Sequence, residues 1–422
     1  MNQLKTLKYL FFFEGFFVIW LFSYQFKNAL SFKSPDITLL LTFILIPWAF
    51  FLAFKDNFKV KISGSFLRGV PLLFILWSAW TLLTFLWSPS QSYGVQKSLC
   101  YLIYTFSGFL MAYYIIGKIF FRIKRFLVSI GIFAILVHLW VLADFWTYGI
   151  NFKEFLETNY LVTGQTLGAG FLILFIYSLN GFLKLKFSSR EIFQERRDLV
   201  RECLLLLGAA TLFYVSLNLG GRGPVLALSA SLFFLYFLNM IYRPSWLLVC
   251  HFFLFSFVFI GIFYGFNSLF NYQGLPLFIE RTPLLLTDPT TALSSDMNII
   301  LRLEYYVSAF KMFLAAPIQG GGFGAWPLFH NLGDIAWHPH NIFFEILSET
   351  GIIGFVLFMG VLFSALKGIS FKFSVKNPLE ISLLILFTFG FLNALKTGDL
   401  NDNIFFLCLI ALMARIPRHK TS

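Results

Sequence analysis

The imidazole groups of this sequence are concentrated in one stretch, His338-Pro339-His340-Asn341, in a chain that contains 6 His residues. Pro339 fixes its own φ and favours an extended backbone at His338, so we expect His340 in a rigid turn. A neutral imidazole can accept a hydroxyl proton near pH 7. Asn341 is suited to cap a helix that begins after it. A capped helix start with two solvated imidazoles is the simpler alternative.

Two carboxyl groups follow this turn at helical spacing. Asn341, Glu345 and Glu349 recur every four residues, so they share one face of the predicted helix. We therefore predict His340 as a catalytic residue and His338, Asn341 and Glu345 as substrate-binding residues.

A second motif runs from Gly220 to Pro224 between two apolar segments, with Arg222 at its centre. Glycines let the backbone approach a ligand closely, and Pro224 suits the first turn of the next helix. Arg222 would then stand beside a helix N-terminus, where the dipole and the free N–H groups favour an anion. We predict Arg222 as catalytic and Gly221 and Gly223 as substrate-binding residues. An arginine that reaches lipid headgroup phosphates is the alternative.

The longest polar excursion of the chain runs over residues 267–350, and loops of this length are usually functional. Within it, residues 296–316 place apolar side chains at helical spacing, with Arg302 elsewhere on the helix surface. We predict Arg302 as a catalytic residue and Arg281 as a further substrate-binding cation. The glycine run from Gly320 to Gly324 predicts a loop that can contact a polar ligand through its backbone.

Arg222, Arg302 and His340 together suit a diphosphate leaving group. A guanidinium group binds phosphate oxygens in a bidentate manner without a metal ion, and the imidazole can activate an attacking hydroxyl. This combination describes transfer of a sugar from a lipid-linked diphosphate, for which we expect neither a metal site nor a cofactor. A transporter whose arginines bind a passing anion is the rival interpretation.

The composition defines the scaffold that must position these residues. Hydrophobic residues make up 58% and charged residues 12% of the chain, and its mean hydropathy is +0.78. Soluble proteins average about 25% charged residues. Apolar runs long enough to cross a membrane recur from end to end. We predict an all-α, polytopic membrane helical bundle, a single integral membrane domain over residues 1–422 with about 12 transmembrane helices. Its large loop, residues 267–350, would be helical and lie between spans nine and ten.

The net charge of +12 is explained by orientation. Lys and Arg concentrate in alternate loops, which predicts both termini in the cytoplasm and the large loop on the opposite side. We therefore expect membrane lipids, and no nucleic acid, among the partners. The four cysteines each lie alone in an apolar segment, which favours packed thiols over disulfides or metal ligands.

The second half of the chain resembles the O-antigen ligase and polymerase superfamily. The resemblance is carried by Arg302, the glycine run, the stretch from His338 to Glu345, the run 349–354 and the upstream Gly-Arg-Gly at 221–223. The first half agrees only in topology and length. Gly221 stands where a serine is common in the superfamily.

The resemblance implies a multi-pass enzyme of the bacterial inner membrane with a periplasmic active site. It implies that Arg222 and Arg302 grip the diphosphate of an undecaprenyl-diphosphate-linked glycan donor and that His340 activates the acceptor hydroxyl. We expect an inverting O-antigen ligase with lipid A-core as acceptor. The alternative is a polymerase that uses a second lipid-linked glycan as acceptor. A protein O-oligosaccharyltransferase and an anion or glycan transporter are less favoured.

Overall fold

The computed structural model describes the chain over residues 12–23, 37–55, 69–148, 160–185, 192–219, 221–269, 297–367, 369–396 and 398–416. All regular structure in these residues is helical, which confirms the predicted all-α class. The predicted site residue Arg281 lies outside the described residues, as do both chain ends.

The described chain folds into helices of very different lengths. In order they are α2 (Phe13–Leu21), α4 (Ile37–Lys55), α5 (Val70–Leu83), η1 (Thr84–Trp87), α6 (Tyr93–Cys100), η2 (Tyr101–Phe106), α7 (Ser107–Met111), η3 (Ala112–Ile116), α8 (Phe120–Tyr148), α10 (Tyr160–Phe182), α11 (Ile192–Asn218), α12 (Arg222–Tyr242), α13 (Trp246–Leu269), α17 (Met297–Ala315), α18 (Trp326–Phe329), α19 (Ile342–Leu366), α20 (Phe371–Ser374), α21 (Pro378–Ala394) and α22 (Ile404–Met413).

Nine apolar segments in the described residues are long enough to cross a membrane, which fits the predicted polytopic class. Two shorter apolar helices, α21 and α22, also belong to the bundle. The predicted number of about 12 spans is not confirmed. Helix α19 begins at Ile342, directly after the predicted cap Asn341 and inside the stretch assigned to the large loop.

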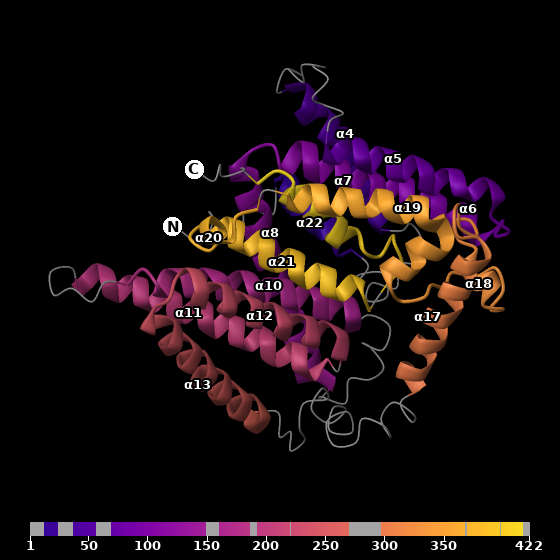
Figure 1. Cartoon of the computed structure of the whole chain (residues 1–422). Coiled ribbons are helices and arrows are strands. Elements are labelled where there is room, and N and C mark those ends of the chain that lie inside the picture. The colour runs from indigo at the N-terminus through magenta and orange to yellow at the C-terminus, as the bar shows by residue number, and fades with distance from the viewer. Residues whose placement is uncertain are drawn as a thin grey trace.

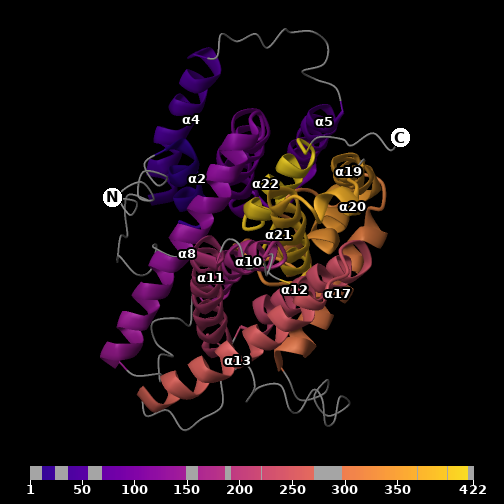
Figure 2. The ribbon, with the colours of Figure 1, turned by 90° about the vertical axis from the view of Figure 1, so that its left-hand side faces the viewer.

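Helix α10 forms the centre of the bundle. Of the candidate spans in the described residues it is the most buried, with 72% of its apolar segment inside the protein. It packs against α8, α11, α12 and α21. In Figure 1, α10 to α13 form the lower half of the molecule and α5, α7, α19 and α22 the upper half, with α21 between them. Figure 2 shows the same bundle from the side, with α4 and α8 along one edge and α17 and α19 along the other.

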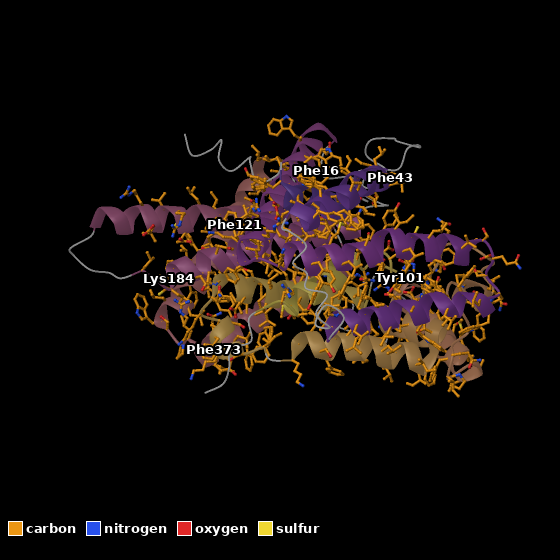
Figure 3. The ribbon with its side chains drawn as sticks, turned by 90° about the horizontal axis from the view of Figure 1, so that it is seen from above. Phe16, Phe43, Tyr101, Phe121, Lys184 and Phe373 are labelled. Carbon is orange, nitrogen blue, oxygen red and sulfur yellow. The ribbon has the colours of Figure 1, made fainter. Side chains whose placement is uncertain are left out.

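Aromatic side chains both fill this bundle and cover its outside. Tyr101 has no exposed surface, whereas Phe43 on α4 is 69% exposed (Figure 3). Water would penalise so much exposed apolar surface, but lipid does not, because hydrocarbon tails are as apolar as these side chains. The pattern of exposure therefore agrees with a bundle that is surrounded by a membrane.

A charged group lies inside the N-terminal part of the bundle. Glu14 on α2 is 1% exposed, and the Arg125 Nη2 and Arg122 Nε atoms of α8 lie 3.4 and 3.8 Å from its Oε1 atom. These arginines supply the partners that a buried carboxylate requires.

Candidate functional site

The predicted functional residues that the structure describes lie at one end of the bundle, where α17 and α18 pack against α19 (Figure 1). Helix α17 spans Met297–Ala315, close to the predicted 296–316, and packs against α19. The same end carries the first residue of α12, which is Arg222, and the turn that follows α21.

A break in α19 anchors the loop that follows α17. Gly351 has a φ of 65° and a ψ of −169°, which interrupts the helix. The N–H groups of Gly321 and Gly322 donate to the carbonyls of Ser348 and Glu349, at 2.9 and 3.0 Å. A Cβ atom on Gly320 would lie 2.4 Å from the Glu349 oxygen, so the two backbones touch directly. The glycine run therefore contacts α19 through its backbone, and its contact with a ligand stays a prediction.

Asp334 connects the loop that carries the histidines to the start of α6. Its carboxylate accepts hydrogen bonds from the Ser90 hydroxyl and from the backbone N–H groups of Ser92 and Tyr93. The bond from Ser90, with those from the backbone, lowers the pKa of Asp334. These contacts fix the loop at residues distant from it in sequence. The indole of Trp80 donates to the Thr350 carbonyl of α19 at 2.8 Å.

The predicted cap at Asn341 is confirmed. Its Oδ1 atom accepts from the N–H groups of Phe343 and Phe344, at 2.9 and 3.2 Å. Its Nδ2 atom donates to the Leu395 carbonyl at 3.1 Å. Asn341 therefore joins the start of α19 to the end of α21.

His340 adopts the left-handed backbone conformation, with a φ of 57°. Residues other than glycine rarely adopt this conformation, and those that do cluster at functional sites. Its ring lies 4.3 Å from that of His338, centroid to centroid, and stacks on Tyr305 of α17 at 5.9 Å. The Trp337 ring meets it edge-on at 5.8 Å. The imidazole is thus held by aromatic neighbours from two segments.

Both imidazoles of this turn are held in the neutral form. Burial, then the neighbouring His338, then the Arg302 guanidinium lower the pKa of His340 to about 3. Burial lowers the pKa of His338 to about 4, although the Asp399 carboxylate acts in the opposite direction. The Nε2 atom of His338 is buried and has no hydrogen-bond partner among the described residues. A neutral imidazole is the form that accepts a proton.

The charge of Arg302 reaches three groups around it. Its guanidinium lowers the pKa of His340 on the loop and of Lys396 after α21, and it opposes the rise that burial causes in the pKa of Tyr306. Tyr305 of the same helix stacks on the His340 ring, which places this part of α17 beside the histidine turn. The half-buried side chain of Arg302 comes from α17, about one turn from Tyr305 and Tyr306.

Lys396 connects the Gly-Arg-Gly motif to this group. Its Nζ atom donates to the Gly223 carbonyl at 2.7 Å, next to Arg222. Burial and the nearby Arg302 lower the pKa of Lys396 to about 8. Gly223 thus provides the link between the start of α12 and the turn after α21.

A fully buried ion cluster lies beneath the histidine turn. The Lys97 ammonium of α6 lies 2.6 Å from the Glu345 Oε1 atom and 2.7 Å from the Glu349 Oε2 atom, and all three side chains are at most 2% exposed. Glu345 also accepts from the Leu400 N–H group at 3.2 Å. Tyr93 donates to Asp399, whose carboxylate in turn accepts from the Asp402 N–H group. The cluster joins α6, α19 and the turn before α22.

Most of the predicted residues come together at this end of the bundle. His338, His340, Asn341 and Arg302 are neighbours, and Gly223 meets them through Lys396. Their roles in binding and catalysis stay predictions.

Two predicted substrate-binding residues have structural contacts. The Glu345 carboxylate points at the buried Lys97, and Gly221 is buried, with the Tyr160 ring 3.3 Å from the position of an added Cβ atom. Both residues are buried against other parts of the protein. A substrate-binding role for either of them stays a prediction.

Sequence reasoning missed Lys97, Lys396 and Tyr305. Lys97 precedes an apolar segment, so the sequence alone suggests a lysine in a loop. The signal that could have found it is its position as a lone ionisable residue at the edge of a span. Lys396 lies in a polar turn whose position facing Gly223 only the fold reveals. Tyr305 reads as part of the apolar periodicity of its helix.

The arrangement can bind an anion and accept a proton. Arg302 and Lys396 supply positive charge near a neutral imidazole, and Arg222 begins the adjoining helix. In the described part of the chain, no group of three or more His, Cys, Asp and Glu side chains is placed to hold a metal ion. The four cysteines, all described, are free thiols.

One comparison with known proteins matches part of the chain to a family. Residues 203–359 match the family described as O-antigen ligase. No curated protein and no solved structure gives a significant match to the chain. The matched range includes Arg222, Arg302 and His340, whereas Lys97 and Lys396 lie outside it.

Proposed function

Because residues 203–359 carry the O-antigen ligase family domain, we propose that this multi-pass membrane protein is an inverting, metal-independent glycosyltransferase. Its donor is a glycan on undecaprenyl diphosphate, and its acceptor is lipid A-core. The reaction takes place at the periplasmic face of the bacterial inner membrane, with both chain ends in the cytoplasm.

The observation that carries the proposal is the grouping of cations around one neutral imidazole. Arg302 acts electrostatically on both His340 and Lys396, and Lys396 contacts the residue after Arg222. A diphosphate needs positive charge on its oxygens, and an attacking sugar hydroxyl needs a base. Both requirements are met within one end of the bundle.

In the proposed reaction, Arg222 and Arg302 bind the diphosphate oxygens. The acceptor hydroxyl oxygen attacks the anomeric carbon from the face opposite to the diphosphate, while His340 takes the hydroxyl proton. The new glycosidic bond forms as the bond to the diphosphate oxygen breaks, so the configuration at that carbon inverts. Undecaprenyl diphosphate leaves with the bonding electron pair.

Binding of the donor would also activate the base. In the structure, the Arg302 charge contributes to the low pKa of His340. Arg302 is the smallest of the three causes, after burial and His338, so a bound diphosphate that offsets its charge raises the pKa of His340 only in part and makes the imidazole a stronger base. Proton acceptance is thereby coupled to donor binding.

The test uses purified full-length protein with a lipid-linked glycan donor. Arg222→Ala and Arg302→Ala are each expected to lose transfer by roughly tenfold to hundredfold, since a charged hydrogen bond contributes about 1.5–3 kcal/mol. His340→Ala removes the proton acceptor and is expected to lose transfer by roughly a hundredfold or more. Arg197→Ala, at an exposed residue of α11, is the matched control and should retain activity. Near wild-type transfer by all three site variants would refute the proposal.

The acceptor and the metal requirement are tested in the same assay. Lipid A-core and a second lipid-linked unit are offered separately, and preference for lipid A-core identifies a ligase. Elongation of the lipid-linked unit alone would identify the polymerase alternative. Transfer is expected to survive EDTA, and inhibition that an added divalent ion reverses would contradict the metal-independent mechanism.

A further inference from the structure

Lys396 lies at the meeting point of the elements that carry the predicted anion-binding residues. Its Nζ atom is 2.7 Å from the Gly223 carbonyl at the start of α12. The preceding residue, Leu395, accepts a hydrogen bond from the Asn341 side chain at 3.1 Å. The lysine is thus joined on one side to the Gly-Arg-Gly turn and on the other to the histidine turn.

The surroundings of Lys396 are positively charged. Arg302 acts on it from α17, and Arg222 is the residue before its hydrogen-bond partner. The ion pairs of the described residues include neither Lys396 nor Arg302. An ammonium has three donors, of which the Gly223 carbonyl takes one. Like charges held together repel, so this arrangement is stabilised when an anion binds between them.

We propose that Lys396 is a third cationic contact for the diphosphate, reaching it from the turn after α21 beside Arg222 and Arg302. The inference rests on the proposed function and adds a residue outside the range that matches the family. The ligand chemistry is a diphosphate ester with at least two negative charges. Lys396 raises the preference for diphosphate over monophosphate, because its extra charge matters most to the more highly charged ligand.

Binding is measured with full-length protein in nanodiscs, using a short polyprenyl diphosphate and the matching monophosphate as probes. Lys396→Met is expected to weaken diphosphate binding roughly tenfold to hundredfold and monophosphate binding less than about threefold. Lys396→Arg keeps the charge and should stay within about threefold of wild type. Lys311→Met, which removes an exposed lysine on α17, is the control and should change neither affinity.

A purely structural lysine would behave differently. If Lys396 serves only to tie α12 to the turn, Lys396→Met lowers thermal stability and weakens both ligands equally, which overturns the inference. Should Lys396→Met not fold, Lys396→Gln is measured instead, since its amide can still donate to a carbonyl but carries no charge. Equal loss of both ligands in Lys396→Gln, or no loss, overturns the inference as well.

Two further arms separate the sources of phosphate. Nanodiscs with and without phosphatidylglycerol test whether the lysine binds lipid headgroups, and a difference between wild type and Lys396→Met that disappears with phosphatidylglycerol contradicts the diphosphate role. Inorganic pyrophosphate is added as a competitor of the polyprenyl diphosphate, which tests whether the diphosphate group binds without its lipid chain. Wild-type protein that binds no diphosphate refutes the proposed function together with this inference. If the wild type binds diphosphate and transfers glycan, and the Lys396 variants bind diphosphate equally well, only this inference is refuted.

Discussion

Replacing Lys97 by methionine should destabilise the protein strongly. Its ammonium lies between the Glu345 and Glu349 carboxylates, at 2.6 and 2.7 Å, and the three side chains are at most 2% exposed. Methionine fills similar space but leaves two carboxylates buried side by side without a cation. Breaking a buried ion pair in this way costs about 3–5 kcal/mol.

The matched variants separate charge from packing. The triple variant Lys97→Met, Glu345→Gln, Glu349→Gln removes every charge of the cluster, so most of the lost stability should return, because neutral replacement of a whole buried ion cluster is often close to neutral. Lys311→Met, at an exposed residue of α17, should change stability by less than about 0.5 kcal/mol.

The assay is the free energy of unfolding in mixed detergent micelles, with glycan transfer measured on the same samples. A loss below about 1 kcal/mol for Lys97→Met would refute the view of the cluster as a buried ion group. A triple variant as unstable as the single variant would show that the lysine acts through packing rather than charge.

Three further outcomes follow from the site. Asn341→Ala should cost about 1–2 kcal/mol of unfolding free energy, whereas Asn341→Asp keeps the cap; equal losses would contradict the cap assignment. Gly320→Ala should destabilise, because its Cβ atom would lie 2.4 Å from a backbone oxygen, while Gly261→Ala, with open space around it, should not; thermal unfolding compares the two. Burial and Arg302 lower the pKa of Lys396 to about 8, so its ammonium loses its proton as pH rises. Diphosphate affinity should therefore fall between about pH 7 and pH 9 in wild type and stay flat in Lys396→Arg, and a parallel fall in both would assign the effect to another group.

Local features of the site could be predicted from the residues themselves. To predict the cap at Asn341, one needs only an acceptor side chain before a helix, and the structure shows this cap. To predict the helix over 296–316, one needs only the spacing of its apolar residues, and the structure shows it as α17. These predictions succeed because each depends on interactions within a few residues of the chain.

Periodicity did not say which face of α17 is buried. The apolar series Leu303, Val307, Phe310 and Leu314 is 46–59% exposed, whereas the buried side carries Tyr305, Ala309 and Met312. In a membrane protein an apolar stripe can face lipid as well as protein, so hydropathy alone does not choose the packed face. The aromatic support of His340 therefore came only from the fold.

The sequence by itself determined the class of scaffold and the chemical types of the site. An apolar, aromatic-rich composition dictates membrane helices, and the motifs around Arg222, Arg302 and His340 lie in the residues that match the O-antigen ligase family. Only the tertiary structure decided which groups meet. Lys97 and Glu349 are 252 residues apart, and Lys396 and Gly223 are 173 apart, so no local pattern records either contact. Buried charges must find partners wherever the packed helices bring them, and that placement depends on the whole bundle.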